Sequence, residues 1–260
     1  MAAQQKEANA PADHHSMRRQ AATFNEARPA GTRGESVARG ARAAYLLNGL
    51  LAGLGFLLVL TLSALGQYDD TPVAGNVYGG NAIGIAGAWG RAADTVSYFT
   101  EWSNVVVAFA LLLLWREPIR DSYWRRVLRA DSLMMITVTA VVYAVLLAPT
   151  QRVTGWSVFT NPLQHIVVPI VTVAVFLAWG PRGWFSWRVV AGALLIPAAW
   201  VVWMLVRGMA VGAYPYDFLD PTTYGYPAVF ATIGKILVFG TVIALLYWAI
   251  DRALVRWRSR

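Results

Sequence analysis

The sequence contains no cysteine and very little histidine. The absence of cysteine from all 260 residues excludes disulfide bonds, thiolate metal ligands and a cysteine nucleophile. Two of the three histidines, His14 and His15, lie near the N-terminus, which leaves His165 as the single histidine of the apolar part of the chain. One imidazole with scattered carboxylates falls short of the three or four ligands that zinc requires. We therefore expect neither a metal site nor a cofactor.

Charged residues are also scarce, at 14% of the chain. A soluble domain of ordinary composition carries about a quarter, so the chain lacks the polar residues that would cover a water-exposed surface. Acidic residues number 14 against 22 basic ones, which gives a net charge of +8. Such a balance can indicate binding to a phosphate backbone, but here most basic residues flank apolar runs. The sequence therefore favours membrane lipids as partners and argues against nucleic acid.

Six long apolar runs occupy most of the chain, in which 57% of the residues are hydrophobic. Each run is close to the roughly 20 residues that cross about 30 Å of hydrocarbon as a helix. The runs are residues 43–66, 95–115, 130–149, 162–179, 189–207 and 227–250. The sequence thus predicts an all-α fold, a polytopic six-helix transmembrane bundle over residues 43–250. Residues 1–42 are predicted to be a disordered basic tail, because they show no apolar periodicity, and residues 251–260 a short basic C-terminus.

The distribution of basic residues predicts the orientation of this bundle. Cytoplasmic loops of membrane proteins carry an excess of Lys and Arg. Eighteen basic residues lie in the tail, in the second and fourth connections and at the C-terminus, against Arg91, Arg152 and Arg207 on the opposite side. We therefore expect both termini in the cytoplasm and a multi-pass protein of the plasma (inner) membrane. The long outer connections would be residues 67–94 and 208–226.

Polar side chains gather near the outer ends of the predicted spans, where each is costly unless it has a role. Thr100, Ser103 and Asn104 are spaced i, i+3 and i+4, so they share one face of the second helix. Asn161 and His165 open the fourth helix at the same depth. This common level predicts a polar site near the extracytoplasmic face.

Two basic residues lie on the same side of the bundle. Arg207 closes the fifth span, and Lys235 lies about 12 Å into the sixth by the rise of an α-helix. We expect Arg207 to meet lipid headgroups, Asp217 or Asp220. Glu101 could pair with Lys235 or Arg207, or could orient the imidazole of the site.

A hydroxyl and an imidazole at matching depth permit nucleophilic acyl chemistry. The Thr100 hydroxyl needs a base to take its proton as it attacks, and His165 is the available one. Asn104, Ser103 or Lys235 could donate to the negative oxygen of the tetrahedral intermediate. The residues also allow a structural reading, in which Thr100 bonds the carbonyl of its own helix at Val96.

Three segments resemble sequence motifs of a known family: YFTEWSN, NPLQH, and YPYDFLD followed by GYP. They are similar to those of the actinobacterial predicted six-transmembrane protein family, which is distantly similar to the androgen-induced and androgen-dependent threonine hydrolases of animals. The resemblance covers roughly residues 43–250. It implies a Thr nucleophile, matched by Thr100, and a His base, matched by His165, acting on fatty acid esters of hydroxy fatty acids. The chain departs from the animal branch in the shorter spacing of this pair and in lacking Thr-rich surroundings at the histidine.

These observations predict an integral-membrane threonine hydrolase of lipid esters, with Thr100 and His165 as catalytic residues. Ser103, Asn104, Lys235 and Arg207 are the candidate substrate-binding residues. The alternative is a non-catalytic lipid-binding or small-solute transport protein, for which Lys235 and Arg207 would matter most. A structural or assembly role is a third possibility. The lipid ester or its fatty acid is the expected ligand, and the oligomeric state stays open.

Overall fold

The structure is a computed structural model that describes residues 30–68 and 80–258. The chain divides into two units, residues 1–40 and 41–260, and the second holds the helices discussed below. The predicted disordered tail falls mostly on residues 1–29, outside the described part. Residues 30–42, however, are helical, because α2 begins at Ala30. This stretch contains three Ala and three Arg, which favour helix, although its three Gly do not.

The described residues form helices and contain no β-strand. The elements are α2 (Ala30–Ala64), η1 (Gly84–Gly87), α3 (Ala88–Thr95), α4 (Phe99–Arg116), α5 (Tyr123–Val142), η2 (Tyr143–Leu147), α6 (Ser157–Pro162), η3 (Leu163–Val167), α7 (Val168–Trp179), α8 (Trp187–Gly192), α9 (Leu195–Val211), η4 (Asp217–Leu219), α10 (Pro221–Tyr224) and α11 (Tyr226–Arg258). The elements η1 and η4 are 3₁₀ turns, whereas η2 and η3 are π-helical turns that continue α5 and α6.

Six helical segments are long and apolar enough to cross a membrane, which confirms the all-α, six-span prediction. They are Ala38–Ala64, Phe99–Arg116, Tyr123–Leu147, Ser157–Trp179, Trp187–Val211 and Tyr226–Trp257. The third begins seven residues before the predicted 130. Its first turn is charged and was missed by hydropathy, but the hydroxyl of Ser122 accepts from the amide of Arg125 and starts the helix there.

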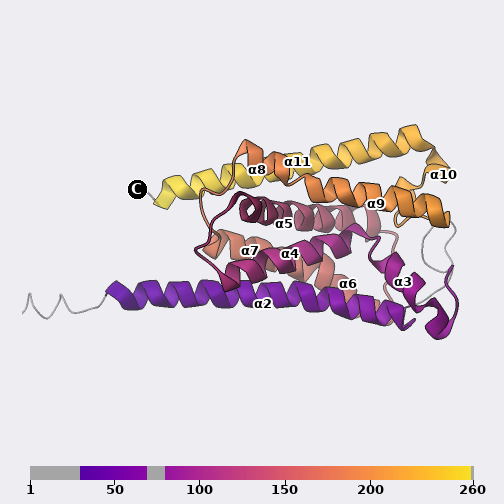
Figure 1. Cartoon of the computed structure of the whole chain (residues 1–260), viewed down its shortest axis with the longest axis horizontal. Helices are drawn as coiled ribbons and strands as arrows, with labels where there is room; N and C mark the ends of the chain where they lie inside the picture. Colours follow the sequence, from indigo (N-terminus) through magenta and orange to yellow (C-terminus); the bar gives the residue numbers. More distant parts are fainter. Residues whose placement is uncertain (1–29, 69–79, 259–260) are drawn as a thin grey trace, which may run out of the picture. The chain divides into compact units, whose positions relative to one another are not determined.

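Helix α5 lies at the centre of the bundle, with α4 and α7 on one side and α11 on another (Figure 1). Leu133, Met135 and Ile136 of α5 are fully buried, as is Phe176 of α7. The outward helix faces carry large exposed apolar side chains, as expected where lipid replaces water as the solvent. The bundle is therefore packed around α5 and apolar outside.

One end of the bundle, which we call the loop end, is formed by the connections at residues 65–68, 80–98, 148–156 and 212–225. Helices α3 and α10 both lie at this end (Figure 1). The buried Arg91 of α3 donates to the carbonyls of Ser63 and Ala64 at the end of α2, and to those of Ala82 and Gly84. One guanidinium thus satisfies helix-end carbonyls that lack partners within their own helix.

A second buried charge, Asp94 of α3, joins this end to α9. It forms an ion pair with Arg207 and also accepts a hydrogen bond from Asn81. The expectation that Arg207 meets lipid headgroups, Asp217 or Asp220 was therefore wrong. Asp220 instead caps α10, where it accepts from the amide of Thr222 and from two threonine hydroxyls. The short helix α3, invisible to hydropathy, supplied the partner.

Candidate active site

The structure brings Thr100 and His165 into hydrogen-bond contact. Thr100 lies in the first turn of α4, after the N-cap residue Tyr98, and its side chain is buried. Its Oγ1 is 3.1 Å from Nε2 of His165, which lies in the π-helical turn η3. The sequence placed these two side chains only at the same predicted depth in the membrane, and the structure brings them into contact between two helical segments.

The second ring nitrogen of His165 fixes the direction of this contact. Nδ1 is 3.0 Å from the backbone carbonyl oxygen of Asn161. A carbonyl can only accept, so Nδ1 carries the hydrogen of the neutral ring and Nε2 presents its lone pair to the Thr100 hydroxyl. A hydroxyl bonded to a base, which is itself oriented by a third group, is the arrangement that activates a hydroxyl for attack.

The backbone around His165 departs from a regular α-helix. Pro162 lacks an amide hydrogen, and the next five residues form the π-helical turn η3. Such turns often occur at functional sites because the extra residue redirects a side chain. The imidazole also stacks on the ring of Tyr143, with centroids 4.1 Å apart and planes at 25°. Tyr143 begins the other π-helical turn, η2, so both turns face each other through these two rings.

The backbone before α4 is held by two indoles, which places Thr100. Trp102 Nε1 donates to the carbonyl of Val96 at 2.8 Å, and Trp200 Nε1 donates to the carbonyl of Ser97 at 3.0 Å. The structural reading in which Thr100 bonds the Val96 carbonyl is therefore not what the described residues show. The hydroxyl is directed at His165 instead.

A further hydroxyl at the site, that of Tyr216, carried no predicted role. It accepts a hydrogen bond from the amide of Phe99 at 3.1 Å, and Tyr216 lines one cavity together with Thr100. Its ring packs edge-on against Tyr98 and stacks on Phe218. Burial raises the pKa of Tyr216 to about 12, although the hydrogen bonds to Thr100 and Phe99 oppose this shift. The phenol therefore stays protonated at neutral pH and can donate.

Only the motif YPYDFLD pointed toward Tyr216. Its connection has no periodicity from which a sequence could place the side chain beside α4. Three 3₁₀ residues, Asp217–Leu219, follow it, and the aromatic cluster around its ring fixes its position.

Ser103 and Asn104 lie beneath Thr100 rather than beside its hydroxyl. Both donate to the Thr100 carbonyl oxygen, at 2.8 and 2.9 Å, and both are fully buried. Thr139 of α5 donates to the Ser103 hydroxyl at 2.9 Å. These side chains hold the first turn of α4 against α5, and their donors are engaged there.

Lys235 and Arg207 are not brought to the site. Lys235 is exposed on α11, and Arg207 is paired with Asp94. Within residues 80–258, no hydrogen bond or ion pair joins either of them to Thr100 or His165. Glu101 accepts from Gln164 Nε2 at 2.9 Å, so its predicted pairing with Lys235 or Arg207 was wrong. Glu101 follows Thr100 and Gln164 precedes His165, so this bond braces the two elements that carry the pair.

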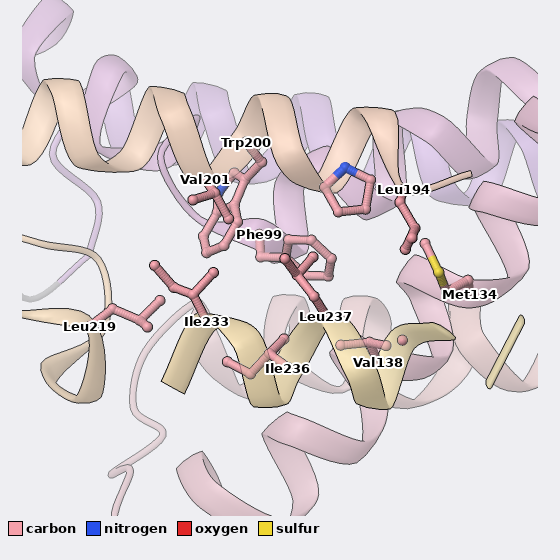
Figure 2. A pocket seen from close by; sticks show the side chains of 12 residues that line it. Phe99, Met134, Val138, Leu194, Trp200, Val201, Leu219, Ile233, Ile236 and Leu237 are labelled. Atoms are coloured by element: carbon pink, nitrogen blue, oxygen red, sulfur yellow. The ribbon is translucent and has the colours of Figure 1, made fainter. Parts of the chain in front are cut away.

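Two adjoining cavities lie on the other side of Thr100. One is lined by Thr100, Tyr216 and Thr139 together with apolar side chains. The other is lined by apolar residues alone (Figure 2). The two share five lining residues, Phe99, Val138, Trp200, Leu219 and Ile236. The hydroxyl of Thr100 thus borders an apolar space, while His165 approaches it from outside that space.

Comparison with protein-family models, curated proteins and solved structures finds no match for this chain. The chemistry of the site is therefore argued from its own geometry. Among the described residues no three His, Cys, Asp or Glu side chains gather as metal ligands would. The geometry offers a buried hydroxyl, an imidazole nitrogen that accepts a hydrogen bond from it, a second hydroxyl nearby, and an apolar space.

Proposed function

We propose that the chain is an integral-membrane hydrolase that cleaves a lipid ester with Thr100 as nucleophile and His165 as base. The contact of Thr100 Oγ1 with His165 Nε2, whose tautomer the Asn161 carbonyl fixes, is the observation that carries the proposal. The adjoining apolar cavity suits a fatty acyl chain better than a polar solute. A fatty acid ester of a hydroxy fatty acid is the substrate type proposed.

In the first half of the reaction, Thr100 Oγ1 attacks the ester carbonyl carbon as its proton passes to His165 Nε2. The tetrahedral intermediate collapses, and Nε2 gives the proton to the departing alcohol oxygen. In the second half, water attacks the acyl-threonine as Nε2 takes its proton. The fatty acid leaves, and the proton returns to Thr100 Oγ1. Both halves use the same base, so no further proton carrier is required.

The negative oxygen of each intermediate needs donors near Thr100. The Tyr216 hydroxyl is bonded to the amide of Phe99, the residue before Thr100, and Tyr216 and Thr100 line one cavity. Thr100 also follows the N-cap of α4 by two residues, where helix amides and the helix dipole favour negative charge. These groups take the role first assigned to Ser103 and Asn104, whose donors are engaged.

The location proposed is the extracytoplasmic side of the plasma membrane. The site lies toward the loop end of the bundle, which carries only three basic residues in its connections. The positive-inside rule would place that end outside the cytoplasm.

A fluorophosphonate probe, which reacts with activated hydroxyls, tests the proposal in detergent-purified protein. We expect labelling of the wild type, none of Thr100→Ala and much less of His165→Ala. Thr232→Ala is a matched control, because the Thr232 hydroxyl bonds only the Ala228 carbonyl of its own helix. Equal labelling of Thr100→Ala and the wild type would exclude the assignment.

The apolar cavity also suits a second function, a lipid-binding protein without catalysis. In that case bound fatty acid would be retained in Thr100→Ala, and no ester would be hydrolysed by the wild type. Loss of retention in Lys235→Ala would support this alternative further. The same purified variants therefore decide between the two functions.

A further inference from the structure

The wholly apolar cavity extends from the neighbourhood of Thr100 along α11. Ile233 and Gly240, both on α11, line it seven residues apart, which corresponds to about 10 Å of helix. In Figure 2, Leu219 and Ile233 lie at one end, and Met134 and Leu194 at the other. Leu219 at one end and Val138 toward the other both line the cavity that Thr100 borders as well. We call the end at Met134 and Leu194 the far end, because it lies opposite Leu219 in Figure 2.

Two features of the sequence open the space at this far end. Leu194 lies in the break between α8 and α9, just before Pro197, where the fifth span is not continuous α-helix. Gly240 has no side chain, and a Cβ built there would lie 3.5 Å from Met134 Sδ and 3.8 Å from Val138. These are ordinary van der Waals distances, so a larger side chain at 240 would have to occupy the cavity itself.

No lining residue of this cavity carries a charge or a side-chain hydroxyl. A carboxylate or free hydroxyl placed in it would lose its water without gaining a partner. The cavity therefore suits the alkyl part of a fatty acyl group and excludes the carboxylate-bearing half of the substrate.

Resting on the proposed function, we infer that this cavity holds the acyl chain of the ester while its carbonyl lies at Thr100. The absence of a side chain at Gly240 then sets the longest chain accepted. Filling position 240 shortens the cavity from the far end and leaves the reacting groups untouched. The expected consequence is a change in chain-length preference without loss of the nucleophile.

The test compares Gly240→Leu with Gly234→Leu on the same helix. Gly234 has open space around its Cβ position and is exposed, so its substitution controls for an added leucine in α11. Hydrolysis of p-nitrophenyl esters from butyrate to palmitate is measured for both. We expect Gly240→Leu to lose at least about tenfold in the palmitate-to-butyrate ratio of kcat/KM, since added methylenes meet a filled pocket. Gly234→Leu should keep the wild-type ratio.

A second measurement separates this inference from the hydrolase proposal. Fatty acids retained by each purified variant are identified by mass spectrometry, with the milder Gly240→Ala included in case the leucine variant does not fold. A shift toward shorter fatty acids in the Gly240 variants supports the cavity assignment even if no ester is hydrolysed. Unchanged retention and an unchanged ester ratio, with fluorophosphonate labelling intact, would overturn the assignment while the hydrolase proposal stands.

Discussion

At the scale of single residues, the direction of every hydrogen bond around Thr100 follows from which atoms can donate. The Asn161 carbonyl accepts from His165 Nδ1, so Nε2 accepts from Thr100. On the other side, the Phe99 amide donates to the Tyr216 oxygen. In the proposed mechanism, the phenolic hydrogen of Tyr216 is the donor offered to the reacting oxygen once the Thr100 proton has moved to Nε2.

Removing the Tyr216 hydroxyl tests the donor role at this scale. Tyr216→Phe keeps the ring that packs against Tyr98 and Phe218 but cannot donate. We expect kcat for ester hydrolysis to fall about a hundredfold, as for loss of one oxyanion donor. Tyr224→Phe, at an exposed tyrosine of α10, should hydrolyse at the wild-type rate. A wild-type kcat in Tyr216→Phe would remove this residue from the mechanism.

At the scale of elements, the site depends on how α4 and η3 are held against each other. Gln164 of η3 donates a hydrogen bond to the buried Glu101 of α4. Each of these residues is the sequence neighbour of one member of the proposed catalytic pair. Loss of one partner would leave a buried polar group without its hydrogen bond. The brace therefore affects stability and the geometry of the pair together.

Gln164→Ala tests this brace. We expect the free energy of unfolding in detergent to fall by about 1–3 kcal/mol, the usual penalty for a buried group left without a partner. Gln67→Ala, at an exposed glutamine that bonds only a nearby carbonyl, is the control and should change little. The role of the brace would be contradicted by equal stability of the two variants.

The cap of α10 gives a pH-dependent prediction. Burial raises the pKa of Asp220, but the hydrogen bonds from Thr222 and Thr223 outweigh it and lower the pKa overall. Because the pKa is lower in the folded state, the ionised carboxylate stabilises the fold at pH values above the unfolded-state pKa of about 4. This stabilisation is lost as the pH falls through the folded-state pKa. Between about pH 6 and about pH 3, the melting temperature of the wild type should therefore fall further than that of Asp220→Asn. Parallel falls would show that the cap contributes nothing.

The membrane-spanning helices could be predicted from the sequence, whereas most of the side-chain contacts between them could not. Hydropathy located all six spans, because apolar length is what a bilayer requires. The shared depth of Thr100 and His165 was a weak signal, and only together with the motif resemblance did it predict that the two side chains would meet. The partners of Glu101 and Arg207 were wrong, because opposite charge alone was used to pair them. Residue spacing could not predict that the neutral Gln164 would bond Glu101, nor that the short helix α3 would bring Asp94 to Arg207.

For the whole molecule, the proposed location of the site depends on which end of the bundle faces away from the cytoplasm. The loop end carries the described connections at residues 65–68, 80–98 and 212–225, and the opposite end carries residues 117–122 and 180–186. Only three basic residues lie in the connections and helix ends of the loop end. The proposed orientation follows from that imbalance alone.

The lack of cysteine makes the orientation directly measurable. Ile83, 97% exposed at the loop end, and Ile119, 95% exposed at the opposite end, are matched positions for single cysteines. A membrane-impermeant maleimide added to intact cells should label Ile83→Cys, and should label Ile119→Cys only after permeabilisation. The reverse pattern would place the site on the cytoplasmic side.

The proposed mechanism requires a covalent acyl intermediate on Thr100, and trapping that intermediate is the decisive experiment. Purified protein is mixed with a long-chain ester, quenched in acid and digested, and the peptides are analysed by mass spectrometry. We expect an acyl adduct on Thr100 in the wild type and no adduct in His165→Ala, because the attack requires the base. Hydrolysis of the ester with no adduct on Thr100, or with an unchanged rate in Thr100→Ala, would contradict the proposed mechanism.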